Sequence, residues 1–380
     1  MLSKLENWTR KVQREAKLAK LSRKSVKIVP DTQNLCGRPF CQLLAEFEVP
    51  TDGSGGGVGR AFEQYLFTRC LNQGKDGILV GSKADIEAQQ ASCCFCHFVH
   101  ARIVASGYTD EDGTAQCFAS CPGGAEEVWL RLRRANGEAV GGLLRYGERV
   151  LFVGDRRYPT PLAGRIVGSG ELEYSRVQHW LQLCDEMHHE VCPVPAPLKE
   201  RRAGAPRLLR VVDVERNCLT EISWQEKYVA LSYVWGNASP PRLYRRELDH
   251  WRQAHSLKKL RKSMPQTHQD AMHFVAQIGQ RYLWFDSLCL IQDDPDDLRK
   301  GTSMMDIIYE GAYLTVIAAA GPGADCGLPS VGHTQRASSQ PTVSIKPGFS
   351  LLLVRSLDKH LNDSVWATRG WTYVDSILTE

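Results

Sequence analysis

The second half of the chain alternates short apolar runs with amphipathic segments, and this alternation restricts the fold more than any other feature. Apolar runs of strand length occur at residues 207–214, 227–233, 281–286 and 313–319. Helical periodicity fills two of the intervals, at 267–278 and from 294 to about 310. Strand and helix in this rhythm predict an α/β fold with a largely parallel sheet and flanking helices in three layers.

The ends of the two predicted helices carry recognisable capping residues. Thr267 and Asp270 fit a capping pair at the start of the first helix. Asp294 fits the N-cap of the second helix, because its carboxylate can accept the free N–H groups of the first turn. Gly311 follows the last periodic residue and predicts the end of that helix.

The first half of the chain is organised differently. Alternation of apolar and polar residues predicts strands at 127–133 and 150–153, and a helix near 174–190 follows. The sequence therefore predicts a smaller, β-containing α+β region before the α/β half. We divide the chain into a basic amphipathic segment at 1–27, a Cys-containing region at 28–192, a Pro/Arg-rich linker at 193–206 and a domain at 207–380.

Charge and hydropathy describe an ordinary globular chain. The 380 residues carry a net charge of +4, so no overall field favours nucleic acid as a partner. Segment 1–27 is a solvated lead helix in the favoured interpretation, and a mitochondrial presequence or an interfacial helix in the alternative. The longest apolar run, near Tyr313, is far below the roughly 20 residues of a membrane span. We expect a soluble, cytoplasmic protein.

Thirteen cysteines occur without a secretory signal, which favours free thiols or metal ligands over disulfides. The zinc candidates are Cys184, His188, Cys192, Cys94 and Cys96, and the further candidate ligands are Cys93, His97, His100, Cys36, Cys41, Cys117 and Cys121. Ligands spaced by eight along one helix cannot all share a tetrahedral ion, and paired C-x-x-C motifs are not found. Buried thiols are therefore the favoured interpretation, and structural zinc is the alternative.

Six motifs follow one another in the second half of the chain. They are YVALSYVWG at 228–236, MPQTHQDA at 264–271, RYLWFDSLCLIQDD at 281–294, Met305 with Tyr309, AYLTVIAAA at 312–320 and RGWT at 369–372. In order and spacing they resemble the fungal heterokaryon incompatibility (HET) domain, with core motifs at 228–372. The pattern WLQLC from Trp180, followed by His188 and Cys192, is similar to the region that often precedes such domains.

The resemblance implies a fungal protein of nonself recognition and regulated cell death. It implies other HET or incompatibility proteins as partners, or association with a second copy. HET domains are remotely similar to TIR domains, some of which cleave NAD while others signal by self-association. NAD or a related nucleotide is thereby implied as a possible cofactor.

Ligands of an open parallel sheet bind beyond the carboxyl ends of its strands, which directs attention to three loops. The candidate nucleotide-binding residues there are Ser232, Tyr233, Trp235, Gly236, Asp286, Gln292 and Asp293, with Gly321–Gly323 after the third strand. Aromatic rings suit base stacking and a carboxylate suits ribose hydroxyls. The alternative, left open here, is that Trp235 is core and Asp286 caps a loop. Trp284 is expected in the core.

Two departures from the family pattern bear on activity. HET domains usually carry D-W-x-x-E before the Met305 position, but Leu298 and Gly301 replace its tryptophan and glutamate. Gly301 falls on the apolar stripe of its helix and should face inward, while Glu310 is expected to face solvent. NAD cleavage is therefore expected to be weak or absent. After RGWT the family pattern is lost at Val374, which is consistent with a truncated C-terminus.

Overall fold

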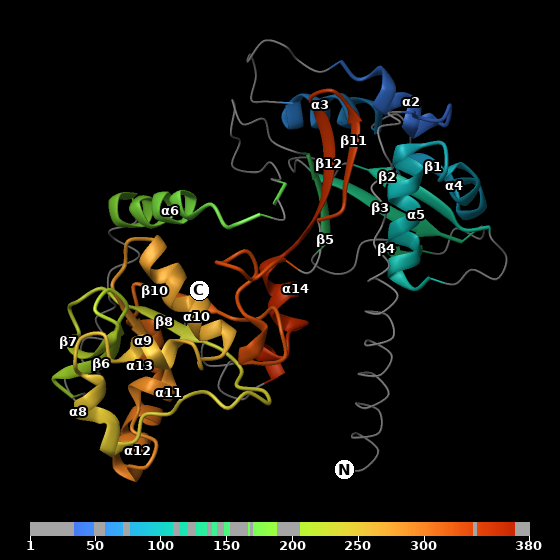
Figure 1. Ribbon diagram of the computed structural model, residues 1–380. Coiled ribbons are helices and arrows are strands. Elements are labelled where there is room, and N and C mark those ends of the chain that lie inside the picture. Colours follow the sequence, from blue (N-terminus) through green and yellow to red (C-terminus); the bar gives the residue numbers. More distant parts are fainter. Residues whose placement is uncertain are drawn as a thin grey trace, which may run out of the picture. The chain divides into compact units, whose positions relative to one another are not determined.

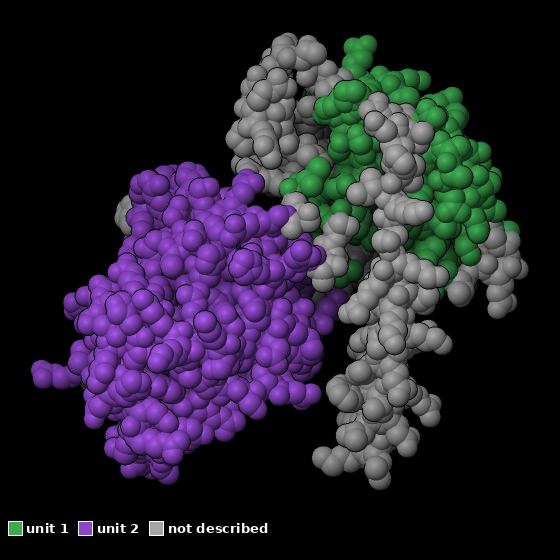
Figure 2. All heavy atoms as spheres, in the orientation of Figure 1, with its two compact units in different colours: residues 1–167, 340–356 green, residues 168–339, 357–380 purple. Residues whose placement is uncertain are grey.

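The protein divides into two compact units, one at residues 1–167 with 340–356 and the other at 168–339 with 357–380 (Figure 2). Each unit has its own hydrophobic core. The computed structural model describes residues 34–48, 58–70, 77–108, 114–120, 127–134, 139–142, 148–152, 166–167, 170–187, 206–336 and 340–368. The predicted basic segment 1–27 and linker 193–206 lie outside the described residues.

An antiparallel sheet of seven strands forms the centre of the first unit (Figure 1). Its order is β1 (Ile78–Ser82), β2 (Gln116–Ser120), β3 (Glu127–Arg133), β5 (Glu148–Phe152), β12 (Phe349–Arg355) and β11 (Thr342–Lys346), and β4 (Ala139–Gly142) pairs with β3. The helices among the described residues of this unit are α2 (Pro39–Glu46), α3 (Val58–Cys70), α4 (Lys83–Gln89) and α5 (Cys94–Ser106). A region of helices and strands is thus confirmed for the first half of the chain.

Period-two alternation correctly located β3. Leu130 and Leu132 are 2% and 3% exposed, whereas Trp129 between them is 40% exposed, because successive side chains of a strand point to opposite faces. The predicted strand at 150–153 overlaps β5.

The hairpin of β11 and β12 comes from the second half of the chain but completes the sheet of the first unit. β12 pairs antiparallel with β5, with Leu351 opposite Phe152 and Leu353 opposite Val150. The hairpin buries Val343, Ile345, Phe349, Leu351 and Leu353 in the core of the first unit. Residues 340–356, within the segment 207–380 that the sequence suggests as one domain, therefore pack with the N-terminal sheet.

The second unit contains a mixed five-stranded sheet flanked by helices (Figure 1). The strand order is β10 (Leu314–Ile317), β8 (Val229–Ser232), β9 (Tyr282–Trp284), β6 (Leu208–Asp213) and β7 (Cys218–Ser223). β8 runs parallel to both of its neighbours, but β6 is antiparallel to β9 and to β7. The α/β class is confirmed, and the predicted parallel arrangement holds only for β10, β8 and β9.

A tight turn explains the antiparallel pairing of β6 with β7. The Asp213 carboxylate at the end of β6 accepts hydrogen bonds from the N–H groups of Glu215 and Arg216, at 3.1 and 2.9 Å. Asn217 then adopts a positive φ of 49°, a conformation that asparagine tolerates. The chain reverses at once into β7, a strand absent from the sequence prediction.

β10, predicted to be buried, is half-buried because it lies at the edge of the sheet.

The described helices of the second unit include counterparts of those predicted near 174–190, at 267–278 and at 294–310, together with four short helices that the sequence analysis does not predict. They are α6 (Tyr174–Met187), α8 (Leu248–Trp251), α9 (Leu257–Arg261), α10 (Gln266–Gln277), α11 (Asp286–Cys289), α12 (Pro295–Ser303), α13 (Met305–Glu310) and α14 (Leu357–Asn362), with short 3-10 turns at Arg245–Glu247, Ala324–Cys326 and Trp366–Thr368. The helix predicted at 294–310 is broken at Met304, whose φ is −115°. No described helix has the length and apolarity to cross a membrane.

One predicted cap is confirmed and the other is wrong. Asp294 accepts hydrogen bonds from the N–H groups of Asp296 and Asp297 at the start of α12, and α13 ends at Gly311. At α10 there is no side-chain cap. Asp270 instead accepts the Leu328 N–H at 2.8 Å and Thr267 accepts the Gly327 N–H at 3.2 Å. Tertiary partners thus take the place of the predicted cap, while Asp270 also accepts a hydrogen bond from Gln266 within α10 at 2.7 Å.

Candidate functional site

Residues beyond the carboxyl ends of β8 and β9 meet at one carboxylate. Because the two strands are parallel neighbours, the loop after Ser232 lies beside the start of α11. The Tyr233 hydroxyl donates to Asp286 Oδ1 at 2.7 Å, and Trp235 Nε1 donates to Asp286 Oδ2 at 3.0 Å. The structure thus brings three of the predicted residues together. We name Tyr233, Trp235 and Asp286 the strand-end cluster.

Two glycines let the loop after β10 approach this cluster. Gly236 has a φ of +61°, and a Cβ there would lie 2.7 Å from the Gly323 Cα atom. The Ala324 N–H donates to the Trp235 carbonyl at 3.3 Å. Glycine is required at this close approach because any side chain would push the two loops apart. The segments after β8, β9 and β10 therefore share one edge of the sheet, as the sequence predicts.

Three other predicted residues use their side chains to hold loops. Gln292 donates to the Asp286 carbonyl at 3.1 Å, and Asp293 accepts the Arg245 N–H at 2.8 Å. Ser232 accepts the Trp366 indole N–H at 2.8 Å in the core. These contacts place Gln292 beside the cluster, whereas the bonds of Ser232 and Asp293 lead away from it.

His268 belongs beside the cluster, although sequence reasoning did not select it. It lies on α10, fully buried, with its ring centroid 4.7 Å from Tyr233 and 4.5 Å from Phe285. Neither ring nitrogen has a hydrogen-bond partner among the described residues. Burial lowers its pKa to about 3, which keeps the ring neutral. The available signal was helical spacing, because position 268 precedes the apolar positions 271 and 275 on one face.

Burial and charge keep the cluster's tyrosine in its donor form. The pKa of Tyr233 lies well above its ordinary value, first because the ring is buried and second because Asp286 is negative. Asp286 and Trp235 are half-buried and Gly236 is exposed, so one side of the cluster faces solvent. The Arg242 guanidinium lies 5.0 Å from the Trp235 ring centroid. An added hydroxyl donor at Asp286 would compete with Tyr233 and Trp235.

A neighbouring side chain fills the space next to position 301, where the family pattern has a glutamate. Gly301 is buried, as predicted, and a Cβ there would overlap Leu290 Cδ2. Leu298 is half-buried against the core. Asp297 accepts the Ile291 N–H at 2.7 Å and pairs with Arg210 at 3.1 Å. Glu310, expected to face solvent, is half-buried. Trp284 is fully buried, which confirms its assignment to the core.

The structure sorts the candidate metal ligands differently from the sequence. Cys96 lies with Cys36, Cys41 and Cys93 in a group that could hold a metal ion such as zinc. Cys94 is half-buried outside this group, and Cys184 is half-buried on α6. His188 and Cys192 lie outside the described residues. The overlooked signal was Cys93-x-x-Cys96 together with Cys36-x4-Cys41.

Comparison with known proteins gives a match to a protein family. Residues 228–375 match the family model for the heterokaryon incompatibility protein (HET). The match covers less than half of the chain, and it includes the strand-end cluster. No curated protein and no solved structure matches significantly. The motifs and the family model agree in their limits, and the chain therefore carries a HET domain of the heterokaryon-incompatibility type at residues 228–375.

Proposed function

We propose that this protein acts in fungal nonself recognition, as a heterokaryon-incompatibility factor that signals regulated cell death. The HET match at residues 228–375 is the observation that carries the proposal. In this proposal the HET domain acts by association, either with a second copy or with another incompatibility protein.

We further propose that the domain signals without cleaving NAD. The remote similarity to TIR domains suggests a glutamate at position 301 as the catalytic group, and glycine supplies no acid, base or charge there. Packing supports this proposal, since the Leu290 side chain occupies the space where a side chain at 301 would begin. Asp286 is a poor substitute because two donors already bind its carboxylate.

A nucleotide-binding regulator is the second candidate. The observation that favours it is the solvent-facing side of the strand-end cluster, where Trp235 and Asp286 are half-buried beside exposed Gly236. Isothermal titration of NAD, ATP and ADP-ribose into the full chain tests this. Asp286→Asn should weaken binding, and Asp293→Asn is the matched control, because Asp293 accepts from Arg245 instead. Absence of heat with all three nucleotides would exclude this candidate.

Induced expression of the full chain in a fungal host tests the leading proposal. Growth arrest with an unchanged NAD content is expected, and arrest accompanied by NAD loss would contradict the association mechanism. Combined Tyr233→Ala and Asp286→Ala should abolish the arrest by releasing the loops of the strand-end cluster. The matched control is Asp296→Ala, a carboxylate that is 73% exposed and pairs only with Arg299 among the salt bridges described. Normal growth, with co-purification of an intact HET protein, would favour an inactive regulator.

A further inference from the structure

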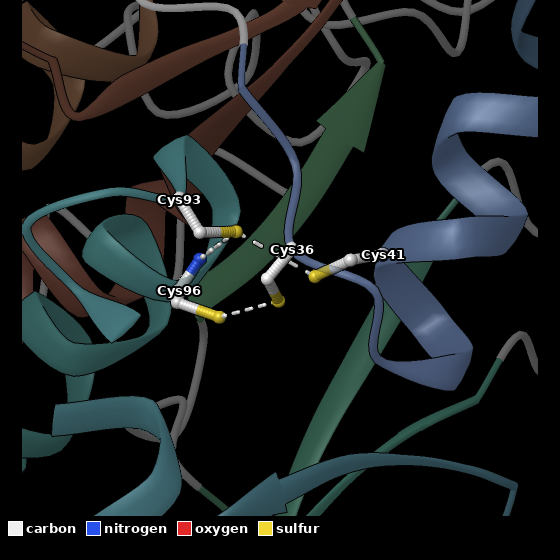
Figure 3. Close-up of side chains that lie close together, drawn as sticks. All are labelled: Cys36, Cys41, Cys93 and Cys96. Carbon is white, nitrogen blue, oxygen red and sulfur yellow. Dashed lines mark hydrogen bonds between the residues drawn. The ribbon is translucent and has the colours of Figure 1, made fainter. Parts of the chain in front are cut away.

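Two short segments of the first unit bring four thiols together (Figure 3). Cys36 precedes α2 and Cys41 lies in its first turn, while Cys93 and Cys96 lie at the start of α5. The Cys36 and Cys96 sulfurs are 3.6 Å apart across 60 residues of sequence, and those of Cys41 and Cys93 are 3.7 Å apart across 52. All four sulfur atoms lie within 4.8 Å of one another.

These separations suit a tetrahedral metal site. Zinc–thiolate bonds of about 2.3 Å at tetrahedral angles place neighbouring sulfurs about 3.8 Å apart. The two shortest separations, 3.6 and 3.7 Å, are close to that value, and the 4.8 Å limit requires only small adjustments. The ligand pattern of Cys36-x4-Cys41 and Cys93-x-x-Cys96 falls within the spacings of structural zinc sites.

Two features near the four sulfurs would complement the negative charge of a zinc–thiolate group. Cys93 is the N-cap of α5, and its sulfur accepts the Cys96 N–H at 3.4 Å, so a negative charge there meets the positive end of the helix dipole. Arg38 stands between Cys36 and Cys41 in the sequence, and its positive charge would offset part of the negative charge of a four-thiolate zinc group. Its guanidinium is oriented by Asp85 at 2.9 Å, in the manner of an outer-shell residue.

The site is closed to substrate. Cys41, Cys93 and Cys96 are at most 1% exposed, and Cys36 is half-buried. Aromatic rings pack next to it, with the centroids of Phe40 and Phe95 5.1 Å apart. Four protein ligands leave no coordination position free, which is the arrangement of structural zinc rather than catalytic zinc.

We propose that Cys36, Cys41, Cys93 and Cys96 bind one Zn²⁺ ion, which fastens α2 to the start of α5. On binding, each thiol releases its proton to solvent, and the four thiolates with the ion carry a net charge of −2. Most of the binding free energy would stabilise the first unit, because the two segments are separated by more than fifty residues in the unfolded chain.

Elemental analysis of the full chain tests the proposal. After purification under reducing conditions without chelator, about one zinc per chain is expected, as in other four-cysteine sites. Cys36→Ser and Cys96→Ser should each lose it. Cys94→Ser, at the neighbouring position, and Cys117→Ser, a buried thiol on β2, are matched controls that should retain zinc. Wild-type protein with less than about 0.1 equivalent, or equal zinc in all four variants, would overturn the proposal.

Cobalt substitution gives a readout that does not depend on how well a serine variant folds. Cobalt-loaded wild type should show the thiolate charge-transfer and visible d–d bands of a tetrahedral four-thiolate site. Cys36→His replaces the half-buried ligand by another zinc ligand, so metal should remain bound while both band systems change. An unchanged spectrum would show that Cys36 is not a ligand. Two disulfides in place of metal, seen as four missing thiols in the denatured protein, would also refute the proposal.

Discussion

Leu290 occupies the space into which a side chain at position 301 would project. Glycine within a helix costs about 1 kcal/mol relative to alanine. Gly301 nevertheless lies buried inside α12, where a Cβ would overlap Leu290 Cδ2. Close packing against Leu290 therefore explains why glycine stands at position 301, although glycine has a low helix propensity. The same contact leaves no room for a carboxylate unless Leu290 moves.

Gly301→Ala should therefore destabilise the protein despite its gain in helix propensity. Overpacking costs about 1–3 kcal/mol and the propensity gain is about 1, so we expect a net loss of about 1 kcal/mol in the free energy of unfolding. In a Leu290→Ala background the clash is absent and the same substitution should be neutral or stabilising. Urea denaturation of the two single variants and the double variant measures the coupling. If the changes in unfolding free energy of the two single variants sum to that of the double variant, the predicted clash is contradicted.

His268 should make the second unit sensitive to mild acid. In the unfolded chain its pKa is the ordinary 6.5, whereas burial lowers the folded-state pKa to about 3. The contribution of neutral, buried His268 to the free energy of unfolding is therefore complete above pH 6.5. It is lost as the pH falls toward 3, because over this range only the unfolded state takes up the proton. At pH 5 we expect a loss of about 2 kcal/mol from this residue.

Denaturation midpoints between pH 7 and pH 5 measure this loss. His268→Phe, which places an apolar ring beside Tyr233 and Phe285, should flatten the dependence. His273 on the same helix lies 3.5 Å from Glu171, so His273→Gln measures separately what that pair contributes to the pH dependence. An equal pH dependence of stability in wild type and His268→Phe would show that His268 is not its source.

At the scale of elements, the β11–β12 hairpin joins the two halves of the chain. It is covalently continuous with the second unit, yet its backbone pairs with β5 of the first. Removing either partner exposes an unpaired strand edge and an apolar face. The HET match at 228–375 includes this hairpin, so the limits of the family model and of the compact units differ.

A fragment of residues 168–380 should therefore aggregate, because Leu351 and Leu353 lose the core that buries them. The same fragment with a short Gly/Ser linker in place of residues 340–356 should remain monomeric in size-exclusion chromatography. If instead the unmodified fragment is monomeric and the linker variant aggregates, the hairpin belongs to the second unit. This comparison also guides cell experiments, for which the full chain is preferable.

At the scale of the whole molecule, the two units have separate cores and need not unfold together. If zinc is bound as proposed, it should stabilise the first unit alone, because all four ligands belong to it. Chelator should increase amide hydrogen exchange in α2 and α5 and leave α10 unchanged. Exchange measured by mass spectrometry with and without chelator, and with chelator plus excess zinc, checks this expectation. Equal deprotection of α10 would contradict it.

Local signals in the sequence determined much of the second unit. Periodicity located β6, β8, β9 and β10, and the order of the motifs predicted the family match. The Asp294 cap was predictable because its partners are two and three residues away. The neighbourhood of Tyr233 and Asp286 was also predictable, since the carboxyl ends of parallel strands meet at one edge.

Only the tertiary structure decided features whose partners are distant in sequence. Asp270 lies within capping distance of Thr267, but its carboxylate bonds Leu328 across 58 residues. The pairing of β12 with β5 likewise joins segments that no local pattern connects. The spacings of the four cysteines mark two candidate ligand pairs, but only the structure shows that Cys36 and Cys96 converge. Periodicity shows which face of a segment is apolar, but not which distant segment covers it. The physical reason is that chain closure and packing choose among many compatible partners.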